Sequence, residues 1–155
     1  MRSEFGEQHF RPLETMELSW RWLSQSHTKM PEPVRQTIRA LRPEVAMSVA
    51  KQAVALFEVA MAGLPFDASG DVEAVTSWLK ALDVGGSESA VISWDDSNAV
   101  VTTWRTFVEY WSDFCYPSSD DVTIWPCRGS WVLRYAHTDE FRFRSLSALH
   151  AASAG

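Results

Sequence analysis

Hydrophobic residues recur at helical spacing through the first half of the chain, and four segments show this period. The longest runs from 43 to 63, with Pro43 placed to open a helix and Gly63 placed to close it. It is apolar on most sides, which is typical of a helix buried between other elements. The other three helices are predicted by Leu13, Met16, Trp20 and Leu23, by Val34, Ile38 and Leu41, and by Val72, Val75, Leu79 and Leu82.

The second half of the chain begins with a predicted strand and a predicted long helix. The run AVISW at 90–94 is short and β-branched and has turn residues on both sides, so we expect a strand there. From Val100 to Cys115 the apolar residues return to helical spacing, and Asp96 or Ser97 is placed to cap the helix. We expect the apolar side of this helix to carry Trp104, Phe107 and Trp111.

Residues 122–143 alternate between apolar and polar side chains, which is the period of a strand. A four-residue turn at 126–129 would pair Ile124 with Trp131. A three-residue loop at 137–139 would pair Ala136 with Glu140, and its aspartate tolerates the left-handed conformation that such a loop needs. The result is a three-stranded meander, and we expect its apolar face to pack on the helix at 100–115. That face comprises Val122, Ile124, Trp131, Leu133, Tyr135, Phe141 and Phe143.

The fold class expected from these patterns is α+β. A helical N-terminal half of about four helices would pack with a small antiparallel meander and one long amphipathic helix in the C-terminal half. The length of 155 residues predicts a single domain, 1–155, with 1–11 as a flexible arm and 146–155 as a C-terminal tail. A boundary at 85–89 would leave two halves that are each small for an independent core.

Charge and composition narrow the classes of partner. The net charge of −6 argues against nucleic acid as the main partner, because phosphate binding needs clustered Lys and Arg. No apolar run is long enough to span a bilayer, and the N-terminus lacks the apolar region of a signal peptide, so we expect a cytoplasmic protein without a membrane partner. Cys115 and Cys127 show no metal-binding spacing, so we expect reduced structural thiols and no metal or other cofactor.

The polar face of the meander is the first candidate site. Nothing in the sequence pattern buries this face, which also carries Thr123 and Val132. An exposed tryptophan beside several arginines is a composition enriched at protein–protein hot spots. A solvated sheet face, with one tryptophan lying flat under arginine stems, explains the same residues. The partner-binding residues predicted here are Trp125, Arg134, Arg142 and Arg144.

The second candidate site is an acid–base cluster around His137. A carboxylate from Asp121, Asp139 or Glu140 could orient this histidine for general catalysis. A turn histidine beside solvated acids explains the same pattern better, because catalysis also needs a cleft and a nucleophile or metal that the sequence does not show. Asp95–Asp96 precede the predicted long helix, and Asp120–Asp121 precede the first strand of the meander. Carboxylates at such positions either accept hydrogen bonds from free backbone N–H groups or, in nucleases, hold metal ions. Whether the chain is an enzyme therefore stays open at this point, although the absence of a catalytic motif favours a binding protein. The alternative to a binding protein is a small hydrolase or nuclease that uses Asp95, Asp121, His137 and Glu140.

The closing pattern W-x-L-x-Y-x-H-x-D-E-F-x-F, from Trp131 to Phe143, is preceded by DFCYPSSDDVTIWP. Together they resemble the C-terminal hairpin of small cytoplasmic bacterial proteins, some of which are similar to immunity proteins of polymorphic toxin systems. The resemblance covers about residues 110–143. It implies a compact acidic protein that binds and blocks a toxin by protein–protein contact, and it implies no catalytic residues.

Overall fold

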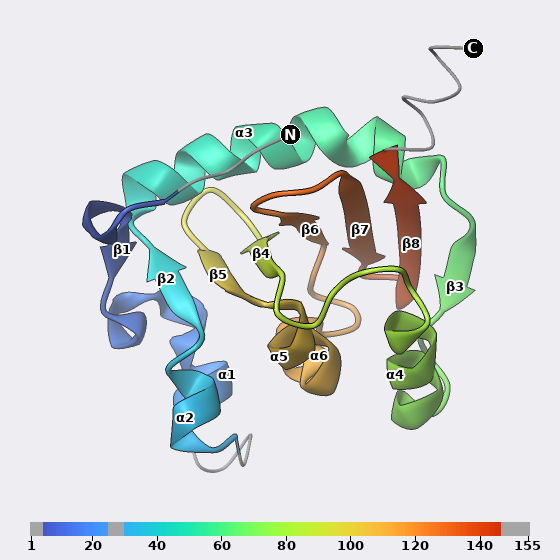
Figure 1. Cartoon of the computed structure of the whole chain (residues 1–155), viewed down its shortest axis with the longest axis horizontal. Coiled ribbons are helices and arrows are strands. Elements are labelled where there is room, and N and C mark those ends of the chain that lie inside the picture. Colours follow the sequence, from blue (N-terminus) through green and yellow to red (C-terminus); the bar gives the residue numbers. More distant parts are fainter. Residues whose placement is uncertain (1–4, 25–29, 147–155) are drawn as a thin grey trace.

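The computed structural model describes residues 5–24 and 30–146, and eight strands of this part of the chain form one antiparallel sheet. The strands are β1 (Phe10–Arg11), β2 (Arg39–Leu41), β3 (Pro65–Asp67), β4 (Ser89–Ser93), β5 (Ala99–Thr103), β6 (Val122–Pro126), β7 (Trp131–Ala136) and β8 (Glu140–Ser145). Their order across the sheet is β1-β2-β5-β4-β6-β7-β8-β3, so the sheet draws strands from both halves of the sequence (Figure 1).

Helices cover the two faces of the sheet unequally. The 19-residue helix α3 (Pro43–Met61) crosses one face, from the β1–β2 side to the β8–β3 side (Figure 1). Shorter elements cover the opposite face, with α5 and α6 near its centre and α4 toward β8 and β3 (Figure 1). These elements are η2 (Leu13–Thr15), η3 (Glu17–Ser19), α1 (Trp20–Leu23), α2 (Glu32–Arg35), α4 (Val72–Lys80), α5 (Trp104–Glu109) and α6 (Trp111–Phe114). The short helix η1 (Glu7–His9) lies between Phe5 and Phe10, which pack on the α3 side of the sheet.

The face away from α3 holds the larger core. As predicted, the apolar side of the meander packs with the aromatic residues of 104–111, and Trp104 lies 5.1 Å from Trp131 between ring centroids. Trp22 of α1 and Phe114 join the same cluster at 5.2 Å between ring centroids. Val122, Ile124, Leu133, Tyr135 and Phe141 are fully buried in this core, and Phe143 is partly buried at its margin.

The face toward α3 holds a second, smaller core. Trp125 and Val132 are fully buried there, beneath the helix. The helix contributes small side chains at its contact with the sheet, such as Ala46 and Ala60, which bring it close to the strands. The remaining buried members of this core are Leu41, Val49, Leu56, Val91 and Ala99.

The expected fold class is wrong in its layout, because most of the molecule is organised by the eight-stranded sheet. Between residue 100 and the last described residue, 146, no long amphipathic helix forms, and the run Ala99–Thr103, with four β-branched residues, forms β5 instead. Asp95 accepts the hydrogen bonds that close the turn between β4 and β5. We had expected the neighbouring Asp96 or Ser97 to cap a helix at this point. The predicted N-terminal helices are also shorter, since the second ends at Arg35 and β2 follows.

The register between β6 and β7 differs from the predicted one by two residues. Ile124 pairs with Leu133, not with Trp131. The reason is that β4 pairs with β6 as far as Pro126, which keeps that residue in the strand and moves the turn beyond it. Because a two-residue shift preserves the alternation of side chains, both faces of the meander have the predicted composition.

Several local predictions are confirmed. Ala136 pairs with Glu140, and Asp139 has the left-handed conformation, with φ of 65°, that the loop needs. Helix α4 begins after Asp71, whose side chain accepts a hydrogen bond from the backbone of Glu73. Strand β4 matches the predicted run to within one residue at each end.

The predicted arm and tail are described only in part. Of the arm, residues 5–11 include η1 and β1, and β1 pairs with β2, so these residues belong to the sheet and its margin. Of the tail, the backbone of Leu146 donates a hydrogen bond to Ser130. The rest of both segments, 1–4 and 147–155, lies outside the described residues.

Candidate functional site

The predicted exposure of Trp125 is wrong. This side chain is 0% exposed because α3 packs over the sheet face that carries it. The sequence pattern around the strand contains no sign of this cover, since the covering helix lies more than sixty residues upstream. Trp125 is therefore part of the core beneath α3 and does not form an accessible binding face.

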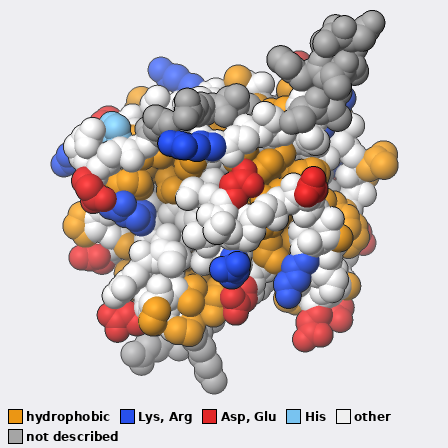
Figure 2. Space-filling view, viewed as in Figure 1, with side chains coloured by type: hydrophobic (Ala, Val, Ile, Leu, Met, Phe, Trp, Pro, Cys, Tyr) orange, Lys and Arg blue, Asp and Glu red, His pale blue; other side chains and the backbone are white. Residues whose placement is uncertain are grey.

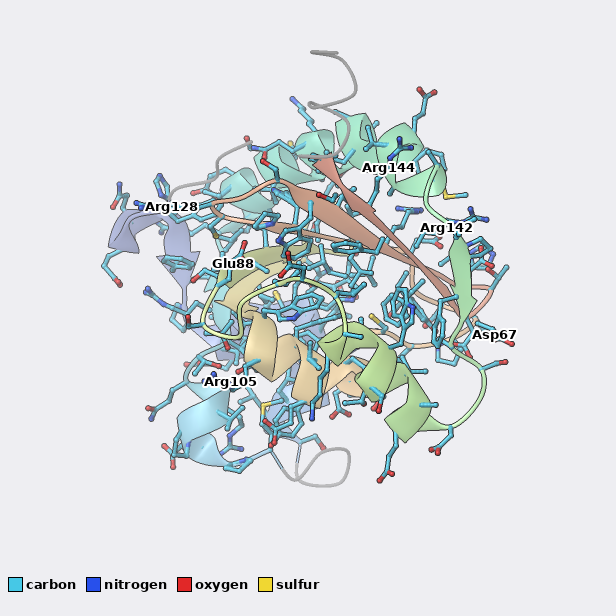
Figure 3. The ribbon with its side chains drawn as sticks, turned by 45° about the vertical axis from the view of Figure 1, so that its right-hand side comes forward. Asp67, Glu88, Arg105, Arg128, Arg142 and Arg144 are labelled. Carbon is cyan, nitrogen blue, oxygen red and sulfur yellow. The ribbon has the colours of Figure 1, made fainter. Side chains whose placement is uncertain are left out.

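Arg142 and Arg144 lie on β8, near the end of α3 and the start of β3 (Figure 3). The Arg142 guanidinium donates hydrogen bonds to the carbonyl oxygens of Met61 and Gly63, at 3.1 and 2.8 Å. These carbonyls belong to the C-terminal end of α3, where a cation also interacts favourably with the helix dipole. Arg142 therefore fastens α3 to the sheet, and both arginines are only partly exposed.

Arg134 differs from the other predicted binding residues because it lines a groove. Its guanidinium donates a hydrogen bond of 3.1 Å to the Thr123 hydroxyl and lies 4.6 Å from the ring centroid of Phe57 on α3. Burial lowers the pKa of Arg134, and the nearby charge of Asp121 acts in the opposite direction. The group stays a cation at neutral pH because an arginine pKa begins so high.

The groove runs between α3 and the ends of β4, β6 and β7, and it has a volume of about 660 Å³. We call it the α3 groove. One wall is the apolar side of α3, and the other combines Trp94 with carboxylates from the turns that end the strands. Its lining comprises Ala50, Ala53, Val54, Ala55, Phe57 and Glu58 of α3, and Ser93, Trp94, Asp95, Asp96, Asp121, Thr123 and Arg134 of the sheet and its turns.

Asp95 has a structural role at this groove. One carboxylate oxygen accepts hydrogen bonds from the backbone of Ser97 and Asn98, both at 2.8 Å, and from the Asn98 side chain at 2.9 Å. These contacts close the turn between β4 and β5 and are those expected of a turn aspartate. Asp96 is the next residue and is exposed.

Asp121 and His137 form the acid–base pair that the sequence suggested. One Asp121 oxygen lies 3.0 Å from the His137 ring nitrogen Nδ1 and also accepts the backbone N–H of His137 at 3.0 Å. Burial alone would raise the pKa of Asp121, but the hydrogen bonds from His137 and the charges of His137 and Arg134 outweigh it and lower this pKa. Asp121 is therefore an ionised acceptor at neutral pH, and its partner histidine is exposed.

The four residues of the predicted catalytic set are only partly brought together. Asp95 and Asp121 line the same groove, and His137 contacts Asp121. Glu140 instead forms an ion pair of 3.5 Å with Arg142. Over the described ranges, no group of three or more His, Cys, Asp and Glu side chains is arranged to hold a metal ion.

One side of α3 is apolar and exposed, and the sequence pattern did not predict this exposure. Met47, Val54, Phe57 and Met61 are 52%, 76%, 41% and 36% exposed, and Leu64, just beyond the helix, is 86% exposed. We call these five residues the outer stripe. The spacing of Met47, Val54, Phe57 and Met61 by seven, three and four residues keeps them on one side of α3, next to the side that contacts the sheet, and Leu64 follows shortly after the helix ends. The excess of apolar residues around the helix was the available signal, and we interpreted it as complete burial.

The chain matches no protein-family model, no curated protein and no solved structure in the comparisons with known proteins. Among the residues that the structure describes, no helix has both the length and the apolar character needed to cross a membrane. The site must therefore be interpreted from its own geometry.

Proposed function

We propose that the protein is a non-enzymatic binding protein of the immunity type, which neutralises a toxin in the cytoplasm by protein–protein contact. Its docking surface in this proposal is the outer stripe of α3 together with the α3 groove. The resemblance of residues 110–143 to immunity-type proteins suggests the class of partner. The observation that carries the proposal is the exposure of the outer stripe.

Exposed apolar side chains are common when they are scattered singly, but a continuous row of them calls for an explanation. The outer stripe is such a row from Val54 to Leu64, where the exposed apolar residues follow one another at three or four residues, and Met47 extends the same side of α3 two turns earlier. Two methionines in the row also favour binding, since their flexible side chains adapt to a partner surface. Figure 2 shows hydrophobic side chains exposed between acidic and basic ones on the surface seen in the view of Figure 1.

The alternative, a hydrolase or nuclease, has one observation in its favour, the contact between Asp121 and His137. The remaining members of that set have other partners, because Asp95 closes a turn and Glu140 pairs with Arg142. We therefore favour binding, and the two functions differ in which variants should lose activity.

The test is a calorimetric titration of the purified protein against the product of the neighbouring gene. Replacing Val54 and Met61 together by glutamine keeps good helix formers on α3 while removing apolar contact area. We expect this variant to bind more weakly by about 2 kcal/mol or more, as hot-spot losses do. Val72→Gln is the matched control, since Val72 is an exposed apolar residue of α4, at 48% exposure, away from the outer stripe.

His137→Ala separates the two functions in the same experiment. Binding through α3 predicts that this variant keeps its affinity and protects cells from the toxin as well as the wild type does. A general base predicts a loss of about 10²–10⁴-fold in turnover. Loss of activity in the His137 variant alone would contradict the binding function.

A further inference from the structure

We infer that the partner segment seated in the α3 groove is an amphipathic helix with basic side chains along one edge. This inference rests on the proposed function and adds the chemistry of the partner. The shape of the docking surface indicates the helix, and the charge of the groove indicates the basic edge.

The outer stripe has the dimensions of a helix-binding surface. From Met47 to Met61 it extends about 21 Å along α3, at about 1.5 Å per residue. Its spacing of seven, three and four residues is the spacing at which a second helix places its own apolar residues. The groove beside Val54 and Phe57 gives such a helix a second wall, formed by Trp94 and the strand ends.

The charge of the groove indicates that a docked helix would carry basic side chains. Four carboxylates line it, those of Glu58, Asp95, Asp96 and Asp121, against the single guanidinium of Arg134. That guanidinium already contacts Thr123 and Phe57. Lysine or arginine side chains on the edge of a docked helix would face the carboxylates of the strand ends and raise both the rate and the selectivity of association.

A second copy of the same chain is a poorer occupant. The exposed charged residues on α3 are Glu44, Lys51 and Glu58, so a second α3 would bring more acids than bases toward an acidic groove. An anionic membrane would meet the same repulsion. Both occupants are outcomes of the experiment below.

The probes are three synthetic amphipathic peptides of about 18 residues, long enough to span about 27 Å as helices. The first has leucines at helical spacing flanked by lysines, the second replaces every lysine by glutamate, and the third keeps the lysines but replaces the leucines by serine. We expect the first to bind the wild-type protein at least tenfold more tightly than either of the others. Its affinity should fall as the ionic strength rises from about 0.01 M to about 0.15 M, because the Debye length shortens from about 30 Å to about 8 Å.

Two variants that each remove one negative charge test whether the carboxylates of the groove are the ones that attract the lysine peptide. Asp96→Asn removes an exposed carboxylate of the groove, and Asp83→Asn removes an exposed carboxylate that follows α4. We expect the first to weaken binding of the lysine peptide about three- to tenfold and the second to leave it unchanged. Thermal unfolding of both variants checks that the fold is intact.

The outcomes separate this inference from the proposed function. Equal binding of the lysine and glutamate peptides, no binding of the lysine peptide, or equal effects of the two asparagine variants would overturn the basic helix. A dimer in sedimentation that the Val54→Gln and Met61→Gln substitutions dissociate, or binding to anionic vesicles that they abolish, would also overturn it. If the neighbouring gene product still binds and loses affinity through the same substitutions, the proposed function stands without the basic helix.

Discussion

The two faces of the sheet are covered in different ways. Several short helices cover one face, and their aromatic side chains meet those of the meander from many directions, which leaves Ile124, Leu133 and Phe141 fully buried. A single helix covers the other face, so burial is complete only along its line of contact, at Trp125 and Val132. Beside that line lie a groove and a row of exposed apolar side chains.

This difference shows where a binding function can be placed on such a fold. A cylinder resting on a broad sheet contacts it along one stripe, so open space remains on either side of the helix. The aromatic core on the opposite face has no comparable row of exposed side chains among its described residues. On the α3 face, the residues of the helix that pack on the sheet differ from those that stay exposed.

Among the tests of this comparison, truncation of one buried tryptophan on each face should have the largest effect on stability. Trp125→Ala and Trp111→Ala should each lower the free energy of unfolding by about 3–5 kcal/mol, as large aromatic truncations in cores do. The side chains are 0% and 4% exposed, on the α3 face and the opposite face respectively. Denaturant midpoints at unchanged m-value measure the effect. A loss below about 1 kcal/mol for Trp125→Ala would mean that α3 does not pack on this residue.

The reactivity of the two cysteine thiols, one on each face of the sheet, tests the same comparison. Burial raises the pKa of Cys127, on the α3 side, to about 11, and burial also raises the pKa of Cys115, in the larger core, well above its usual value. We expect native Cys127 to be alkylated about 10²-fold more slowly at pH 8.5 than an ordinary thiol, with a rate that rises as pH approaches 11, because only the thiolate reacts. Cys115 should react only on unfolding. The Cys115→Ala and Cys127→Ala variants assign the two rates, and fast alkylation of Cys115 in the native state would contradict its burial.

The smallest test concerns the anchoring of α3. Arg142→Ala removes the donors to the carbonyls of Met61 and Gly63 and should cost about 1–2 kcal/mol of stability. Arg144→Ala is the control from the same strand, and we expect it to change stability by less than about 0.5 kcal/mol. Equal losses in the two variants would show that the contact to α3 is not the source of the effect.

Local patterns in the sequence were sufficient for elements whose signals lie within a few residues. The regular spacing of Val72, Val75, Leu79 and Leu82 predicted α4, and the alternation of 122–143 predicted which meander residues share a face. The run at 99–103 shows the limit of such signals. Its apolar residues are compatible with a helix that continues into Trp104 and also with a strand beside β4. The segment forms a strand because it pairs with β4 on one side and with β2 on the other.

The candidate site was less predictable than the fold. Arg134, Asp121 and His137 could be named because their residue types and spacing are visible in the sequence, and two of them line the α3 groove. The burial of Trp125 could not be predicted, because it depends on a helix that comes from a distant part of the chain. The exposure of the outer stripe could not be predicted for the same reason. The sequence of an apolar helix shows which of its sides could be buried, but it does not show which sides other elements cover.

The sequence by itself determined the loop at 137–139, the spacing that forms α4 and the composition of each meander face, because these depend on side chains two to four residues apart. The tertiary structure alone decided which face of the meander meets α3, where β6 ends, and which apolar residues of α3 stay exposed. Those outcomes depend on pairings such as β4 with β6 and on packing between segments more than fifty residues apart. A periodic pattern specifies what an element can bury, and only the arrangement of the other elements specifies what covers it.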